Sequence, residues 1–249
     1  MHTLSFAHSL VSACPFLQRL FGERHTHPAI LANNAIFRSL DQNRPIEEYD
    51  FVVLDTELTG FSVAEDAIVS IGAVRIRGMR LNPADSFFAM VDPGRPLPKA
   101  STLVHRITPQ AVEGRPRLQE VLPALVEYCN GSLIVGHHIG LDMRFLNHAC
   151  SRYLGGTLAT PCLDTLKLAQ VYEAEQWENY YDRYQSNVSY QLGDLAVRYG
   201  LPLFDRHDAL QDAMQTAYLF LYLVRSLRQG GIATLKDLYL SGRSWRFYF

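Results

Sequence analysis

A pair of carboxylates directly behind an apolar run constrains this chain more than any other feature. Residues 51–54 are all apolar and predict a buried strand, and Asp55 and Glu57 follow them two positions apart. Because strand side chains alternate between faces, both carboxylates are expected on one side of the strand end. Crowded carboxylates resist ionisation unless a cation neutralises them, and Mg²⁺ or Mn²⁺ prefers oxygen ligands. Taken alone, the pair also fits a solvated strand end or a helix cap.

The composition excludes some classes of protein and leaves others open. Of the 249 residues 48% are hydrophobic, which supports a substantial buried core, and the net charge is only −2. A polyanion would therefore have to be held by local groups or by bound metal. No stretch approaches the ~20 apolar residues of a membrane span. We expect a cytoplasmic protein with no membrane partner, and free cysteines, because no C-x-x-C spacing occurs.

The first part of the chain, residues 1–48, is predicted to be a partly helical N-terminal extension. Apolar side chains between positions 10 and 21 can form one face of a short helix. Residues 25–34 are expected to be a connector because they are rich in His, Asn and Pro. His25 and His27 form an H-x-H pair, but no other ligand type clusters nearby, which favours a surface loop over a metal site.

From about residue 48 onward the order of predicted elements becomes regular. Predicted strands lie at 51–55, 67–77, 86–91 and 133–135. Predicted helices lie at 118–129, 141–154, 189–199 and 208–227. A strand meander followed by alternating helices and strands indicates an α/β fold, with a mixed sheet flanked by helices. We predict one domain over residues 49–229 and a tail at 230–249 that packs on it.

A further acid follows the fourth predicted strand. Residues 135–142 lead from that strand through a Gly-containing turn into a helix, so Asp142 is expected in or beside the first helical turn. Strand ends and helix starts are where sites are built in open sheets. The alternative is an ordinary N-terminal acid favoured by the helix macrodipole.

The last predicted helix carries the remaining candidates. Asp208, followed three positions later by Gln211, predicts a capping box, so the helix begins there and His207 lies just outside it. A histidine on the entering loop can swing over a site into which Asp212 points from the second turn. The alternative is that His207 is a loop or capping histidine.

Three blocks in this order resemble the DEDDh (DnaQ-like) family of 3′-to-5′ exonucleases, which includes the proofreading epsilon subunit of bacterial DNA polymerase III. The blocks read DTELTG, HHIGLD and HDALQD, and the segments PKASTLVHRIT and LDTLKLAQ support them. The resemblance covers about residues 49–227. It implies a ribonuclease H-like fold with a mixed five-stranded sheet, an antiparallel meander followed by parallel strands, flanked by helices.

The resemblance also implies a two-metal site and its chemistry. The residues that would hold two Mg²⁺ or Mn²⁺ ions are Asp55, Glu57, Asp142 and Asp212. His207 would take the proton of the attacking water, a role that histidine fills most often. The positions that match nucleotide contacts of the family are Thr56, Leu58 and His105. The implied product is a nucleoside 5′-monophosphate.

The chain departs from the family at several positions. His138 stands where many relatives have Asn and Leu141 where many have Phe, which could alter contacts with the terminal nucleotide. Ala100 replaces an acidic residue of the polymerase subunit, so the resemblance to the family is closer than to that protein. The insertion at 172–190 is rich in aromatic residues that could stack on bases or pack on the domain.

Together these observations predict a metal-dependent 3′-to-5′ exonuclease that acts on single-stranded DNA ends, with a DNA polymerase as a candidate protein partner. One alternative is a 3′-end trimming ribonuclease of the same family, since the chemistry does not depend on the sugar. Another is a non-catalytic domain that binds nucleic-acid ends or a polymerase. A third is an unrelated, metal-free α/β binding protein whose acids only cap helices.

Overall fold

The computed structural model describes residues 26–176 and 189–244, and a five-stranded sheet of order β3-β2-β1-β4-β5 forms its centre. The strands are β1 (Asp50–Leu58), β2 (Ile68–Arg77), β3 (Arg80–Met90), β4 (Ser132–Gly136) and β5 (Cys162–Asp164). β1, β2 and β3 pair antiparallel, whereas β4 pairs parallel with β1 and with β5. The antiparallel meander followed by parallel strands is the mixed sheet that the sequence predicts.

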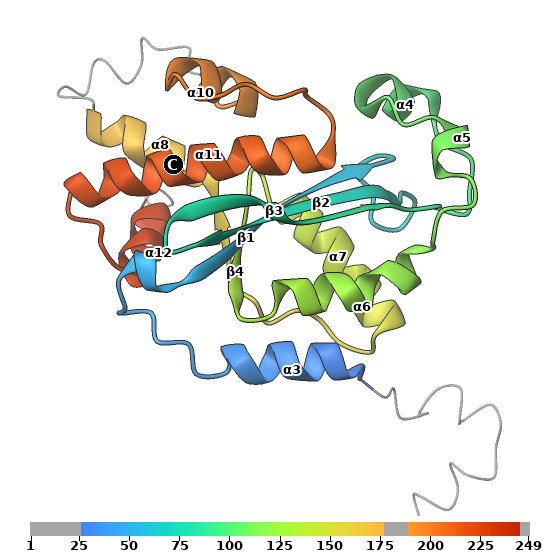
Figure 1. Ribbon diagram of the computed structural model, residues 1–249, viewed down its shortest axis with the longest axis horizontal. Helices are drawn as coiled ribbons and strands as arrows, with labels where there is room; N and C mark the ends of the chain where they lie inside the picture. The colour runs from blue at the N-terminus through green and yellow to red at the C-terminus, as the bar shows by residue number, and fades with distance from the viewer. Residues whose placement is uncertain (1–25, 177–188, 245–249) are drawn as a thin grey trace, which may run out of the picture.

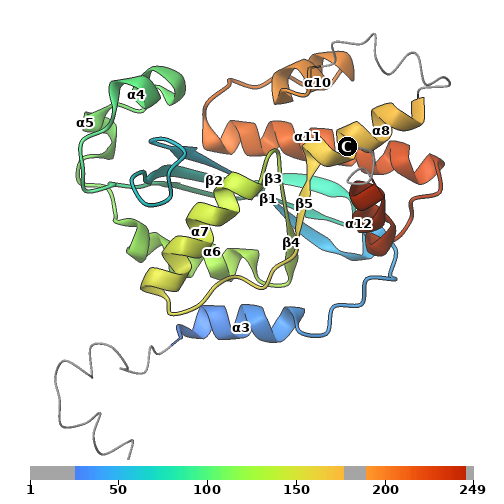
Figure 2. The same ribbon diagram turned by 180° about the vertical axis from the view of Figure 1, so that it is seen from behind.

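Helices cover both faces of the sheet, as the two opposite views in Figures 1 and 2 show. On one face lie α8 (Thr165–Gln176), α10 (Leu192–Arg198) and α11 (Ala209–Gln229); on the other lie α3 (Pro28–Phe37), α6 (Leu118–Cys129) and α7 (Gly140–Tyr153). The shorter elements are η1 (Ile46–Glu48), α4 (Lys99–His105), α5 (Pro109–Val112) and α12 (Leu235–Ser244). None of the described helices combines the length and the apolar character needed to cross a bilayer.

The run at 51–54 is apolar throughout because β1 is buried on both faces. Phe51 and Val53 belong to the cluster under α11, whereas Val52 and Leu54 belong to the cluster under α6 and α7. The rings of Phe51 and Phe220 lie 4.8 Å apart, which anchors α11 on the strand. Each fully buried side chain of this size contributes about 1.5–3 kcal/mol to folding. The carboxyl end of β1 is therefore held firmly between two helical layers.

Several predicted boundaries are wrong. Residues 28–37 form α3 rather than a connector, because the Nδ1 atom of His27 accepts the N–H of Ala29 and Pro28 occupies the first turn, where proline is favoured. The third strand begins at Arg80 and not at residue 86, since a tight turn with positive φ at Gly78 and Met79 returns the chain at once.

Other elements were predicted in part or not at all. The helix predicted from residue 189 begins at Leu192. α4, α5 and α12 were not predicted: α4 and α5 have only seven and four residues, and α12 is amphipathic but has only ten. The predicted helical face at 10–21 lies outside the described residues, as does most of the insertion at 172–190. Of that insertion, Tyr172 packs on the domain, with its ring 5.6 Å from Tyr199.

Candidate functional site

Three carboxylates meet at the carboxyl end of β1. Asp55, Glu57 and Asp212 each offer an oxygen, and these oxygens all lie within 4.8 Å of one another. Asp55 and Glu57 point to the same side because they are two residues apart on a strand, and that side faces α11. Asp212 comes from α11 itself. The structure therefore brings together residues that are about 155 positions apart in the sequence.

A glycine on the neighbouring strand lets α11 come this close. Gly72 pairs with Asp55 across the β1–β2 ladder. A Cβ atom at Gly72 would lie 2.2 Å from the backbone of both Ala209 and Leu210, the first two residues of α11. The sequence analysis missed this role. The available signal was an isolated glycine within a strand pattern, which often marks a close approach of another backbone.

The start of α11 is capped as predicted, although only half of the capping box forms. The Oδ1 atom of Asp208 accepts the N–H groups of Leu210 and Gln211, at 3.1 and 3.0 Å. The side chain of Gln211 binds the N–H of Asp205 instead of turning back to Asp208. Asp212 is the fourth helical residue, so it points in from the first turn rather than from the second.

Asp142 reaches the same place from the opposite layer. It lies in the first turn of α7, as predicted, and is buried. Thr56, between Asp55 and Glu57, faces this layer and binds Asp142 Oδ1 twice, through its N–H at 3.1 Å and its hydroxyl at 2.5 Å. Asp142 stands beside the group of three oxygens rather than within it, and its charge acts on Asp55. All four predicted carboxylates thus converge.

Burial and crowding raise the pKa values of these carboxyl groups. The pKa of Asp55 lies well above its usual range, first because of burial and then because of the charge of Asp142. Burial and the charge of Asp212 raise the pKa of Glu57 to about 8. Burial raises the pKa of Asp142 to about 6, against the hydrogen bonds from Thr56 that lower it.

The cluster is compensated only in part, by the charges of His207 and Arg206, which act on Asp212 and lower its pKa against the effect of burial. In the described part of the chain, none of the four carboxylates forms an ion pair with Lys, Arg or His. Burying several charged carboxylates without a counter-charge is unfavourable, so a neutralising partner is expected. A donor set made only of carboxylate oxygens fits a hard divalent cation such as Mg²⁺ or Mn²⁺.

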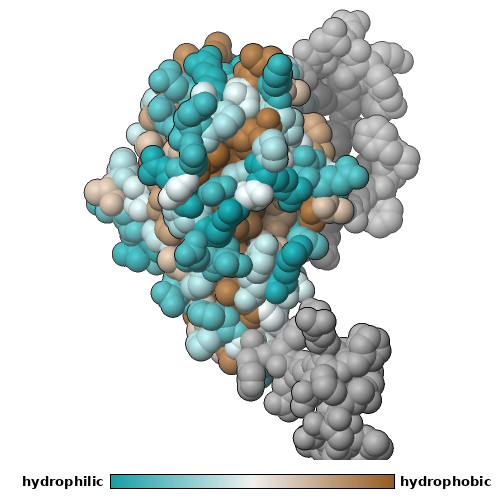
Figure 3. Space-filling model, turned by 90° about the vertical axis from the view of Figure 1, so that its right-hand side faces the viewer, coloured by the Kyte–Doolittle hydropathy of each residue, from teal (hydrophilic) through white to brown (hydrophobic). Residues whose placement is uncertain are grey.

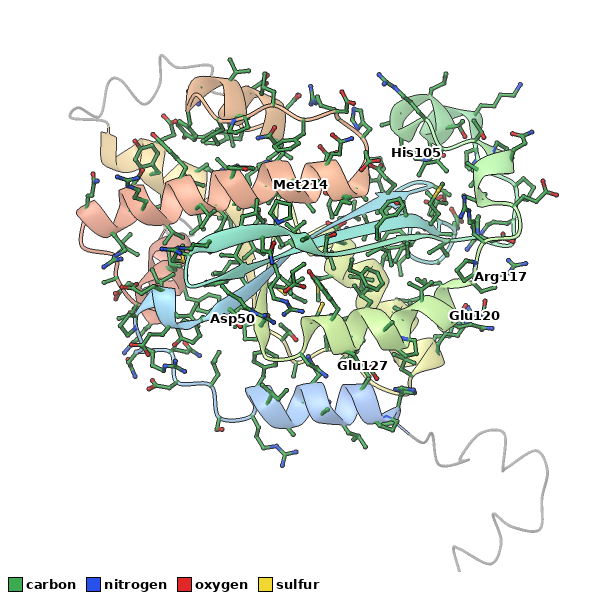
Figure 4. All side chains as sticks on the ribbon, viewed as in Figure 1. Asp50, His105, Arg117, Glu120, Glu127 and Met214 are labelled. Carbon is green, nitrogen blue, oxygen red and sulfur yellow. The ribbon has the colours of Figure 1, made fainter. Side chains whose placement is uncertain are left out.

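Two histidines lie beside the cluster. His207 lies on the loop before α11 with φ 66°, and its N–H donates to Asp212 Oδ2 at 2.9 Å. His105, at the end of α4, is 3% exposed, and its Nδ1 accepts the N–H of Ile107. Its Nε2 is buried and has no partner in the residues described. Burial lowers the pKa of His105, and the charge of His207 adds to this effect. Figure 4 shows His105 beside the end at which α11 begins.

The histidine of the middle sequence block serves the scaffold. Both ring nitrogens of His137 are engaged, Nδ1 with the hydroxyl of Thr165 and Nε2 with the carbonyl of Tyr190, each at 2.9 Å. The neighbouring residue His138 adopts φ 60°, and its N–H donates to Asp164 at the end of β5. These bonds fix the turn that delivers Asp142 to the site.

The surroundings of the cluster differ in charge from the chain as a whole. Residues 93–117, which include α4 and α5, hold five basic residues and one acidic residue, whereas the chain carries a net charge of −2. Lys99 and Arg106 are exposed, and neither forms an ion pair with a described residue. Figure 3 looks onto this end of the molecule, where hydrophilic residues surround a hollow with a hydrophobic floor.

Comparisons with known proteins show the family of the chain. The family model described as Exonuclease matches residues 52–220. The DNA polymerase III subunit epsilon of Aquifex aeolicus is 30% identical over 190 residues, which cover 76% of this chain and 88% of that protein. The PolC-type DNA polymerase III of Thermotoga maritima is 31% identical over 203 residues, 82% of this chain. The chain spans only 14% of the length of that polymerase.

Solved structures with the same fold include two nucleases bound to DNA. Exonuclease X in complex with 5′ overhanging duplex DNA superposes with a TM-score of 0.56 at 22% identity, over 77% of this chain and 99% of that one. Exonuclease I of E. coli in complex with a dT13 oligonucleotide gives 0.61 at 16% identity, over 74% of this chain and 42% of that one. At these identities the likeness establishes the fold, and the predicted ribonuclease H-like sheet is confirmed.

Proposed function

The chain belongs to the exonuclease family, and from this premise we propose that it hydrolyses single-stranded DNA from the 3′ end and releases nucleoside 5′-monophosphates. The observation that carries the proposal is the cluster of Asp55, Glu57 and Asp212, whose oxygens lie within 4.8 Å of one another beside His207 and form no ion pair with a described cation. Crowded carboxylates destabilise the metal-free fold, and a bound divalent cation would neutralise them.

Two Mg²⁺ or Mn²⁺ ions are part of the proposal. The residues that would hold them are Asp55, Glu57, Asp142 and Asp212. When bound, such ions supply the positive charge that activates water and stabilises the leaving 3′ oxygen. The protein contributes rigidity, because Thr56 fixes the carboxylate of Asp142 through two hydrogen bonds and β1 is held between two layers.

The remaining residues act on the proton and on the nucleotide. His207 takes the proton from the attacking water as general base. Thr56 and Leu58 flank Glu57 and contact the terminal nucleotide, and His105, at the end of α4, is assigned to the same nucleotide from the family resemblance. Because Thr56 also holds Asp142, contact with substrate at this strand end is linked to the acidic cluster.

The proposed substrate path follows the basic segment 93–117. α4 and α5 lie at the end of the sheet that carries the acidic cluster (Figure 1). The exposed cations of the segment attract the phosphates of a strand whose 3′ end enters the site. The relatives named above are polymerase III proteins, so a DNA polymerase is the proposed protein partner and the cytoplasm the proposed location.

Degradation of labelled oligonucleotides tests the proposal. Single-stranded DNA and RNA of one sequence, labelled at the 5′ end, are incubated with Mg²⁺, with Mn²⁺ or with chelator, and Asp55→Asn serves as the inactive control. We expect a metal-dependent ladder that shortens from the 3′ end, and release of 5′-monophosphates. A 3′-phosphate should slow the reaction strongly. Cutting of a circular single strand, or accumulation of 3′-monophosphates, would contradict the proposal, and faster loss of RNA would assign the trimming ribonuclease.

A further inference from the structure

The loop that carries His207 is fastened to α11 by side chains of that helix. Residues 201–208 connect α10 to α11 without forming a helix or strand. The N–H of Phe204 donates to Gln215 Oε1 at 3.2 Å, and the N–H of Asp205 donates to Gln211 Oε1 at 3.1 Å. These two N–H groups therefore find their acceptors on α11, whereas the N–H of Leu201, at the start of the loop, donates to the carbonyl of Ala196 in α10.

These acceptors follow one stripe of the helix. Gln211, Gln215 and Tyr218 are spaced four and three residues apart, which places them on one face of α11. The ring of Phe204 stacks on Tyr218, with centroids 5.7 Å apart and an interplanar angle of 25°. Gln215 is only 4% exposed, so water does not compete for its bond to the loop. The stripe thus binds the loop through two amides and one ring.

The backbone conformation of His207 needs support from the residues around it. Its φ of 66° lies in the left-handed region, which residues with a Cβ rarely adopt. A conformation of this kind persists only where its surroundings impose it. The N–H of His207 binds Asp212. Gln211 holds the residue two positions before His207, and Gln215 holds the residue three positions before it.

We propose that Gln215 and Gln211 are positioning residues for His207. They hold the loop on the helix that also carries Asp212. The position of His207 relative to Asp212 is therefore fixed. The inference rests on the proposed role of His207 as general base. The side-chain oxygen of each glutamine accepts an N–H of the loop, and each is proposed to act through the loop.

A double-mutant cycle tests this role. Gln215→Met keeps the volume of the side chain and removes the acceptor for Phe204. In the full chain we expect kcat on a single-stranded oligonucleotide to fall about 10- to 100-fold, no more than the full worth of general-base assistance. The KM should change little, and so should Mn²⁺ binding measured by calorimetry. Gln229→Met, the same change at the far end of α11, should leave kcat unaltered.

The decisive comparison uses a chain without the base. In a His207→Ala background, Gln215→Met should lower kcat less than about twofold, because both changes remove the same contribution. An equal loss in both backgrounds would show that Gln215 acts on the metal site or on the fold, and would overturn the inference. A His207→Ala chain with wild-type kcat would contradict the proposed general base itself.

Amide hydrogen exchange measures how firmly the loop is held on α11, and this measurement does not depend on nuclease activity. Gln215→Met should speed exchange in residues 201–208 by about tenfold or more, because local opening of the loop becomes easier, while the strands keep their protection. If Gln215→Met does not fold, Gln211→Ala at a half-buried position carries the same two measurements. Unchanged exchange of the loop in either folded variant would overturn the inference, even if the wild-type protein proves inactive as a nuclease.

Discussion

The two ends of β1 differ in whether the charged side chains beside them are paired with an opposite charge. Near the beginning of the strand, Arg75 of β2 is buried, but its guanidinium donates to Ser132 Oγ and to the carbonyl of Tyr128. It also lies 3.1 Å from Asp85 and over the ring of Tyr128. Asp50, labelled in Figure 4, is paired with Arg77 at the same end. At the other end, the described residues around Asp55 include no paired cation.

This difference separates a structural charge from a functional one. A buried charge that is paired with an opposite charge is tolerated by the fold and costs most when its partner is removed. A buried group of like charges destabilises the fold unless something from outside neutralises it. The end of β1 that carries Asp55 is therefore the candidate binding site, and the paired charges at the end that carries Asp50 stabilise the fold.

The largest expected effect is the loss of activity in Asp55→Asn. Loss of a residue that only supports a metal ligand typically costs 10- to 100-fold, so loss of a ligand should exceed about 100-fold. The metal-free variant should melt no lower than the metal-free wild type, because one repelling charge has gone. Oligonucleotide degradation and thermal unfolding measure the two outcomes. Wild-type turnover in the variant would remove Asp55 from the site.

The next largest effects are expected from substitutions of the two histidines, which should change different kinetic constants. His207→Ala is expected to lower kcat by about 10²-fold or more, since general-base assistance is worth about 10²- to 10⁴-fold. His105→Ala should raise KM and change kcat less, because its proposed contact is with the nucleotide. Steady-state kinetics with a single-stranded oligonucleotide separates the two constants. Equal and small losses in both variants would reduce His207 to a loop residue.

Substitutions at the Asp50 end of β1 should change the free energy of unfolding and leave nuclease activity unchanged. Arg75→Met is expected to lower the free energy of unfolding by about 3 kcal/mol, because it breaks a buried ion pair and leaves Ser132 and the carbonyl of Tyr128 without a donor. Arg77→Met is the matched control: its side chain is 63% exposed, and a loss below about 1 kcal/mol is expected. Urea unfolding measures both. Turnover of the folded fraction should persist in each variant.

The acidic end should make the metal-free protein sensitive to pH. A carboxyl whose pKa is higher in the folded chain than in the unfolded one binds its proton more tightly when folded, so stability falls as pH rises. The window runs from the ordinary carboxyl value of about 4 up through the pKa of Glu57, about 8. Melting temperatures measured in chelator should fall across this window. Mn²⁺ should restore them most at its upper end, and a pH-independent gap would contradict this assignment.

The smallest expected effect concerns the basic segment. Each phosphate contact on a single strand contributes about 0.7 to the slope of log affinity against log salt. Lys99→Gln with Arg106→Gln should therefore flatten the salt dependence of kcat/KM by up to about twice that amount. A thymidine 5′-monophosphate nitrophenyl ester lacks the further phosphates that Lys99 and Arg106 are proposed to contact, so its hydrolysis should not change. Arg225→Gln on α11 serves as the control.

How far the sequence could predict the molecule depended on the range of the interactions. The run at 51–54 and the cap at Asp208 are local patterns, and both predicted their elements. The convergence of Asp142 and Asp212 followed from the family resemblance, not from spacing. The glycine at position 72 signals the close approach of a backbone but not which segment approaches, and the hydrogen bond from the Phe204 N–H to Gln215 depends on how the loop folds back on α11, so the local sequence identifies neither partner.

The metal requirement of the nuclease reaction tests the central claim most directly. Chelator-treated protein is mixed with a 5′-labelled single strand, and Mn²⁺ is then added in steps while release of mononucleotide is recorded. We predict no release before addition, release that saturates as Mn²⁺ is bound, and none at any concentration with Asp55→Asn. Equal release in chelator and in Mn²⁺ would show that the clustered carboxylates at the end of β1 are not the catalytic centre.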